Sequence, residues 1–389
     1  TATVDSITVA STGAVGIGVT APTGLFSVGT GSAFQVNGSG GMTFNPTSTT
    51  PVTNVTNSVT SISAGTIGSW ATLTALPDLA DNTRATSYAG YVYVAGGYNG
   101  AAFLSTVYSA QIKADGTLGT WSTLNTLPAV TQAHIMVASQ GYLFIVGGYI
   151  GAYASTVYSA KILDGGIIGS WNTLNTLPQV IASAGGDVYN GYIFVAGGQT
   201  TADAVISTVY SAQINGNGTI GSWATLNTLP VTLQDTGVVA SGGYLYVAGG
   251  TSDAFYTGAK STLYSAPIKA DGTIGSWATL NTLPVQVMGM AASSLNGYLY
   301  VTGGHTSAGA SAVVSTVYST QLKADGTIGS WSTLNTIPVA RRYMADVATN
   351  GYIYILGGQI SSGARLSTVY SAPLGATNLV ANTSSTFAT

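Results

Sequence analysis

The chain lacks cysteine and glutamate and has very little charge. Its 389 residues include 9 Lys and Arg and 12 acidic residues, all of them Asp. Without cysteine, disulfides, thiolate nucleophiles and cysteine-based metal sites are excluded. Nine scattered cations do not build the basic patch that nucleic-acid binding requires. The scarcity of Glu, Lys and Arg also argues against long solvated helices.

Long hydrophobic runs are absent as well. None approaches the roughly 18 residues of a membrane-spanning helix, so we expect no membrane span. The apolar runs are short, such as Tyr142–Val146, and end in Gly-Gly, which is typical of buried strands. The many apolar and aromatic residues disfavour disorder. A weakly charged chain rich in Ser, Thr, Asn and Gly suits an extracellular protein at a cell or virion surface.

The chain is built of six repeats, each marked by one tryptophan. The spacing from Trp to the first Gly of the following Gly-Gly is the same in all six copies, from Trp70–Gly96 to Trp331–Gly357. The spacing from the Thr of a later Ser-Thr pair to the next Trp is also constant, as in Thr106–Trp121. Only the interval from Gly-Gly to that Thr varies, and it is shortest in Gly147–Thr156 and longest in Gly249–Thr262 and Gly303–Thr316. One loop per repeat therefore absorbs all insertions.

Each repeat predicts four strands. The last repeat indicates strands at Met344–Thr349 and Gly351–Leu356, and the preceding one a third at Ser315–Thr320; the fourth carries the tryptophan. An Asp-Gly turn, as at Asp115-Gly116, joins the third strand to the fourth. We place Asn215 at the position of Asp115 in the third complete repeat. Repeats of about 50 residues with four strands each are typical of propeller blades.

The repeats resemble the Kelch family of β-propellers. The resemblance rests on the Gly-Tyr-x-Tyr-x-x-Gly-Gly runs, on the tryptophan near each repeat end and on Pro-x-x-Arg-Arg at Pro338–Arg342. An Arg soon after Pro occurs in the last repeat only, which departs from the family pattern. The resemblance implies an all-β fold with a six-bladed Kelch-like propeller over residues 67–376. We expect the Trp70 strand to complete the last blade and close the ring.

The segment ahead of the repeats, residues 1–66, differs from them and predicts a β-rich extension. We expect short strands, of which Val4–Val9 is the first, and propose Val4, Ile7 and Val9 as assembly residues. The others are Val15–Val19, Leu25–Val28, Phe34–Val36 and Met42–Phe44. Residues 16–28 resemble the stalk repeats of trimeric viral or surface fibres. A sheet of such short strands is marginal alone, so it needs its own propeller, sister chains in a trimer or a filament neighbour, unless it is a plain linker. Residues 377–389 are a polar tail.

No catalytic or metal-binding pattern stands out. Two histidines and one Asp per turn do not supply the ligands of a zinc or calcium site, so we expect no metal and no cofactor. The repeated Trp and Tyr are explained by blade packing. Since a binding site breaks the repeat symmetry, we look for residues that occur in one repeat only.

Such residues fall into two groups. The variable loops, which project from one face, carry Phe103, Tyr153, Asp203, Asp253, Tyr256, Lys260, His305 and Arg365. The strand expected to line the central channel carries Arg84, His134, Asp235 and Arg342, with Asp346 nearby. Loops on a rigid scaffold often carry function, so the loop face is the primary candidate.

Two functions fit these features. The first is an extracellular structural or adhesive protein without enzymatic activity. It is joined to copies of itself as a filament or trimer through strands of its termini, and its propeller contacts glycans or a cell-surface receptor. The second is a soluble carbohydrate-binding or carbohydrate-processing propeller. A β-rich extension favours the first reading, because a lone enzyme has no need of it.

Overall fold

The computed structural model divides the chain into two compact units, Thr1–Thr60 and Ser61–Thr389. In the first unit the structure describes five short strands. In the second it describes residues 63–201, 204–254, 257–306 and 312–375. Val4, Asp203, Tyr256 and the tail 377–389 lie outside the described residues.

The first unit contains one five-stranded sheet with the strands in chain order. The strands are β1 (Ile7–Val9), β2 (Val15–Ile17), β3 (Phe26–Val28), β4 (Phe34–Val36) and β5 (Met42–Phe44). β2 and β3 run parallel, while the other neighbours are antiparallel. Each strand has three residues. All five lie within the ranges that the sequence predicts, and the last two match those ranges at both ends.

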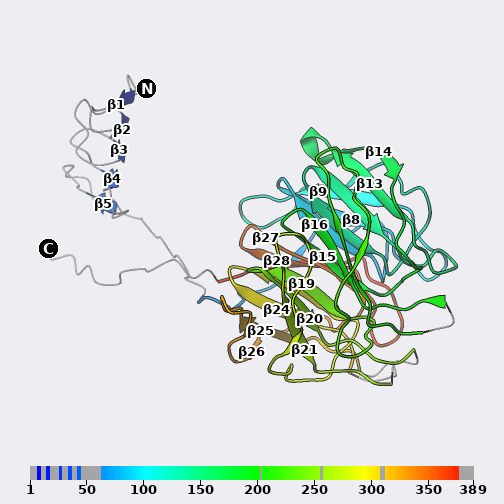
Figure 1. Cartoon of the computed structure of the whole chain (residues 1–389). Coiled ribbons are helices and arrows are strands. Elements are labelled where there is room, and N and C mark those ends of the chain that lie inside the picture. Colours follow the sequence, from blue (N-terminus) through cyan, green and yellow to red (C-terminus); the bar gives the residue numbers. More distant parts are fainter. Residues whose placement is uncertain are drawn as a thin grey trace. The chain divides into compact units, whose positions relative to one another are not determined.

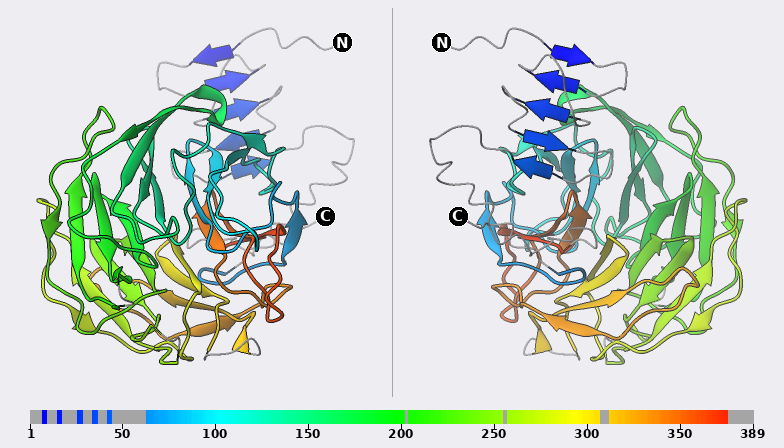
Figure 2. Two further views of the ribbon diagram at one scale, coloured as in Figure 1. Left: turned by 90° about the vertical axis from the view of Figure 1, so that its right-hand side faces the viewer. Right: turned by 90° about the vertical axis from the view of Figure 1, so that its left-hand side faces the viewer.

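The second unit is a six-bladed β-propeller of four-stranded sheets (Figures 1 and 2). The inner strands are β7 (Arg84–Tyr88), β11 (Ile135–Ser139), β15 (Gly185–Tyr189), β19 (Gly237–Ser241), β23 (Ala291–Leu295) and β27 (Ala345–Thr349). The second strands are β8 (Tyr91–Ala95), β12 (Tyr142–Val146), β16 (Tyr192–Ala196), β20 (Tyr244–Ala248), β24 (Tyr298–Thr302) and β28 (Tyr352–Leu356). Neighbouring inner strands contact one another round the ring.

The Ser-Thr pair directly precedes the third strand of each blade, and the Trp directly precedes the outermost strand except in β14, which contains Trp171; the prediction that the fourth strand carries the tryptophan was therefore wrong in five blades. The third strands are β9 (Val107–Gln111), β13 (Val157–Ile162), β17 (Val209–Gln213), β21 (Leu263–Pro267), β25 (Val317–Gln321) and β29 (Val369–Pro373). The outermost are β10 (Ser122–Thr123), β14 (Ile168–Thr173), β18 (Ala224–Thr225), β22 (Ala278–Thr279), β26 (Ser332–Leu334) and β6 (Ala71–Leu73). The all-β, six-bladed fold predicted from the repeats is thus confirmed.

The last blade combines both ends of the ring. β6 pairs antiparallel with β29, with Tyr370 opposite Thr72. Further backbone hydrogen bonds join the ends, among them those from Gly68 N–H to Pro373 O at 2.9 Å and from Gly375 N–H to Thr66 O at 3.1 Å. The first and last segments of the ring therefore share one sheet, which leaves no blade short of a strand.

Tight turns explain why each motif contains glycine. Gly116 adopts φ +77°, and the Thr117 N–H and hydroxyl both donate to Asp115 Oδ1, at 2.9 and 2.6 Å. These bonds lower the pKa of Asp115. In the third complete repeat the same two bonds run from Thr219 to Asn217. The position equivalent to Asp115 is therefore Asn217, and our assignment of Asn215 was wrong by two positions.

A second reason for glycine in this turn is a ring packed against it. The ring of Tyr352, on the preceding blade, lies where a Cβ on Gly116 would stand. Five equivalent contacts complete a circuit round the propeller: Gly166 with Tyr91, Gly218 with Tyr142, Gly272 with Tyr192, Gly326 with Tyr244 and Gly65 with Tyr298. The repeated Tyr that opens each second strand is thus a structural contact between blades.

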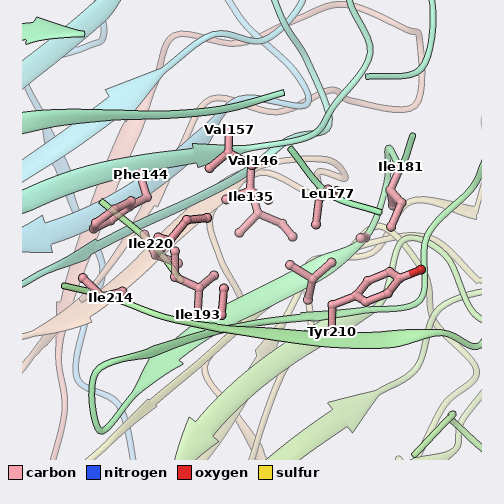
Figure 3. Close-up of a cluster of buried hydrophobic side chains, with 14 residues drawn as sticks. Ile135, Phe144, Val146, Val157, Leu177, Ile181, Ile193, Tyr210, Ile214 and Ile220 are labelled. Atoms are coloured by element: carbon pink, nitrogen blue, oxygen red, sulfur yellow. The ribbon is translucent and has the colours of Figure 1, made fainter. Parts of the chain in front are cut away.

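The hydrophobic core lies between neighbouring blades. Figure 3 shows one such layer, in which Ile135 and Phe144 of one blade face Ile193 and Tyr210 of the next. Trp223 packs at the edge of this layer, and the other Trp residues take equivalent places. Because each layer joins two blades, burial of apolar surface holds the ring together as a whole.

Candidate functional site

Six backbone groups form a closed hydrogen-bonded ring at one end of the inner strands. The residues are Asn82, Ala133, Ser183, Asp235, Gly289 and Tyr343. Each donates its N–H to the carbonyl oxygen of the previous member, at 2.8–3.0 Å, and Asn82 donates to Tyr343. All six have φ between +49° and +58°. Only one is glycine, so the ring holds five side-chain-bearing residues in a conformation they rarely adopt.

A cavity of about 330 Å³ lies in the central channel beside this ring. Ser183, Asp235, Gly289 and Tyr343 of the ring contribute to its wall, and the rest comes from the six inner strands and the residues just before them. Four charged side chains line it: Arg84 on β7, Asp187 on β15, Asp235 ahead of β19, and Asp346 on β27. Three carboxyl groups thus share the cavity with one guanidinium group.

Burial dominates the electrostatics of the cavity. It raises the pKa of Asp187, Asp235 and Asp346, each to about 6. Arg84 opposes the rise for Asp235 and Asp346, and burial lowers the pKa of Arg84 itself. Asp187 is the best satisfied carboxylate, because it accepts hydrogen bonds from Val188 N–H at 2.7 Å and from Ala240 N–H at 2.8 Å.

A second asymmetric feature is a row of four aromatic rings on the loop face, the face formed by the segments between second and third strands. The aromatic row consists of Tyr98, Phe103, Tyr149 and Tyr153, with successive ring centroids 5.4, 5.6 and 5.4 Å apart. Arg365 lies over the Tyr98 ring at 4.9 Å. All four rings are half-buried, so each keeps some surface toward solvent.

The predicted loop-face residues have different environments. Arg365 pairs with Asp81 at 2.9 Å. The Asp253 carboxylate accepts hydrogen bonds from Thr257 N–H and hydroxyl within its own loop, and the Lys260 N–H donates to Gly250 O. His305 is 1% exposed and in edge contact with Tyr343, and burial lowers its pKa to about 4. His305 is therefore a core residue and not part of a contact surface.

The predicted channel residues also divide. Arg84 and Asp235 line the cavity, whereas His134 and Arg342 do not. His134 is fully buried, and neither ring nitrogen has a hydrogen-bond partner among the described residues; burial lowers its pKa to about 3. His134, proposed as a channel residue, is therefore a core residue whose ring makes no hydrogen bond to the described residues. Arg342 donates instead to the Gln359 side chain at 2.9 Å.

Several functional candidates were missed at the sequence level. Tyr98, Tyr149 and His305 occupy one repeat position, directly after Gly-Gly, where other blades have Gln or Thr. Because two repeats share the tyrosine, a selection of residues that occur in one repeat only retains His305 and omits Tyr98 and Tyr149. Asp187 was missed because inner strands vary too much between repeats to mark one residue.

Within the described residues, no group of three or more His, Cys, Asp or Glu is arranged to hold a metal ion. Over the same part of the chain, no helix has the length and apolar character needed to cross a membrane.

Comparison with known proteins supports the fold alone. No protein-family model and no curated protein matches the chain. Among solved structures, one titled "Structure of YjhT" is similar over 76% of this chain and 95% of its own, with a TM-score of 0.61 and 14% sequence identity. In all, 726 chains of solved structure match. A fold shared this widely does not specify a function.

Proposed function

We propose that this protein is an extracellular adhesive subunit that acts by binding and not by catalysis. The aromatic row is the observation that carries the proposal. It occupies one sector of an otherwise regular ring and combines apolar faces with hydroxyl groups, as recognition surfaces often do. In two other blades the position of Tyr98 holds Gln199 or His305, and the position of Phe103 holds an aliphatic residue, Val205 or Val313.

The rest of the molecule suits this role. The ring is a rigid scaffold with few charges, so identical subunits pack closely with little like-charge repulsion. The first unit has only three-residue strands, and such a sheet gains stability from a partner surface. We therefore assign contact with the target to the loop face and self-assembly to the first unit.

Adhesion is tested by substitution in the aromatic row. Phe103→Ala and Tyr149→Ala are compared with Val205→Ala and Val313→Ala, which change bridge positions equivalent to Phe103 in other blades. The probe is retention of full-length protein on beads of cellulose or chitin and on collagen-coated beads. We expect at least tenfold loss for the aromatic variants and none for the controls. Equal retention of all four variants on every surface contradicts the proposal.

Carbohydrate binding by a soluble propeller is the second candidate. The aromatic row favours it too, since sugar rings present C–H faces that pack on aromatic side chains. Binding measurements in solution and on surfaces distinguish the two functions. Tight binding of short soluble oligosaccharides by a monomeric full-length protein supports the second candidate, whereas binding that appears only on surfaces supports adhesion.

A further inference from the structure

The channel cavity has an unbalanced set of charges. Among the described residues, Arg84 is the only cationic side chain on its wall, which it shares with Asp187, Asp235 and Asp346. When these groups are ionised, the wall has an excess of negative charge in a partly enclosed space. This imbalance lies within the channel and is independent of the aromatic row.

Arg84 does not neutralise the carboxylates by direct contact. Over the described residues the structure contains one ion pair within 4.0 Å, and it joins Arg365 to Asp81. The Arg84 Nη1 donates to the backbone oxygen of Thr83 at 3.0 Å. Its attraction to Asp235 and Asp346 therefore acts across a gap, which a polar ligand of suitable size would fill.

Two of the carboxylates are also short of hydrogen-bond donors. Asp235 is 7% exposed, and its Oδ2 has no partner among the described residues. The Oδ2 of Asp346 is likewise without a partner there. The hydroxyl groups of Ser183 and Ser293 lie close enough to lower the pKa of these carboxyl groups, but neither completes a bond to the two Oδ2 atoms. A buried carboxylate oxygen without a donor destabilises the fold, and residues that weaken a fold in this way are typical of binding sites.

From these observations we infer that the channel cavity binds a small molecule that carries a primary ammonium group. An ammonium group is a compact positive charge with three hydrogen-bond donors. It would therefore balance the negative charge of the cavity wall and donate to the carboxylate oxygens that have no partner. The Arg84 guanidinium group then donates a hydrogen bond to an acceptor on the same molecule, such as a hydroxyl oxygen. A volume of about 330 Å³ corresponds to roughly ten water molecules in the liquid, which fits a ligand of monosaccharide size.

Three sugars that differ mainly in charge test this inference: glucosamine with its ammonium group, neutral glucose, and anionic glucuronate. Binding to the full-length protein is measured by calorimetry at pH 7 and low salt, where attraction between charges is least screened. We expect glucosamine to bind at least tenfold more tightly than glucose, and glucuronate to bind most weakly. Equal binding of glucosamine and glucose, or no binding of either, overturns the inference.

Variants locate the site. Asp235→Asn and Asp346→Asn should each weaken glucosamine binding at least tenfold and reduce its advantage over glucose. Asp115→Asn removes the same charge from an exposed turn where Asn217 already occurs in another blade, and it should leave binding unchanged. If Asp115→Asn weakens binding as much as Asp235→Asn, the effect is general attraction and the inference fails. Tyr149→Ala should not alter glucosamine binding, so this test stands apart from that of adhesion.

Discussion

The indole N–H of Trp171 donates a hydrogen bond of 3.1 Å to the backbone oxygen of Asn125 in the preceding blade. In return, the Asn125 side-chain amide donates to the backbone oxygens of Ile168 and Gly169 beside that tryptophan, at 3.2 and 3.1 Å. Each of the other five Trp residues makes the equivalent bond to the blade before it. The outer edges of the blades are therefore linked to one another.

Loss of one such link should be measurable. Trp171→Phe keeps an aromatic ring but removes the donor, and we expect the free energy of unfolding to fall by about 1 kcal/mol. Asn125→Ala removes the reciprocal bonds and should cost a similar amount, of about 1 kcal/mol. Because the acceptor of Trp171 is a backbone atom that Asn125→Ala retains, the two losses should add in the double variant. Urea unfolding measures all three; a double variant no weaker than either single one contradicts two separate bonds.

The turn glycines differ in what surrounds them, and this predicts different costs. Gly90 and Gly116 have nearly the same φ, +81° and +77°, but a Cβ on Gly90 meets no atom within 4 Å. Gly90→Ala should lower stability by about 1–2 kcal/mol through backbone strain alone. Gly116→Ala adds a collision with the Tyr352 ring, for roughly 1–3 kcal/mol more. Equal losses in urea unfolding contradict the role of the ring contact.

Replacing the Asp235 carboxyl group should stabilise the fold at neutral pH but not at acidic pH. Its pKa in the fold is about 6, above the usual 3.8. The folded state therefore holds this proton more tightly, and the resulting stabilisation is present at pH 4 and lost as the pH rises through 6. Asp235→Asn should be more stable than the native protein by about 3 kcal/mol at pH 7 and nearly equal to it at pH 4.

Two comparisons make the pH prediction specific. Asp115 has a lowered pKa, so Asp115→Asn should give no gain at pH 7. His134 acts in the opposite sense to Asp235, because its pKa is about 3 in the fold and near 6.5 when unfolded, so it destabilises the fold as the pH falls below 6.5. Urea unfolding from pH 4 to pH 7.5 separates these contributions. A gain for Asp235→Asn at pH 4 as large as at pH 7 rules out ionisation as its cause.

Self-assembly through the first unit is tested by truncation. Negative-stain electron microscopy compares full-length protein with residues 61–389, which form the second compact unit and retain β6. We expect filaments or trimers from the full chain and single rings from the shorter one. Single rings from both contradict assembly through the first unit, and assemblies from both place the contacts on the propeller.

The sequence predicts the ring because the repeats carry their own geometry. Constant spacing from Trp to Gly-Gly fixes strand number and blade order, and the Asp-Gly turns fix how the outer strands connect. The site is less predictable because it depends on contacts between blades. Asp187 approaches Ala240 of the next blade, and Phe103 reaches Tyr149 across a blade boundary. Such neighbours appear only when the twist and tilt of each sheet are known.

The histidines show the same limit. His134 and His305 are rare residues in irregular positions, which in a sequence favours exposure or function. Both are buried instead: His134 directly follows the left-handed ring member Ala133, and His305 pairs with Met288 just beyond the end of its blade's second strand. The repeat position of His134 holds Thr, Ala or Met in the other blades. Because these side chains include polar and apolar types, the sequence does not reveal that the position is buried.

The hydrogen bond between Gly375 and Thr66 has a consequence for the gene. Every boundary between blades uses the same Tyr–Gly contact and the same Trp bond, including the boundary next to the chain ends. The propeller should therefore form whichever blade is synthesised first. A circular permutant that joins residue 375 to residue 66 and starts in the exposed loop at Gly100 should fold into the same propeller, with any blade as its first.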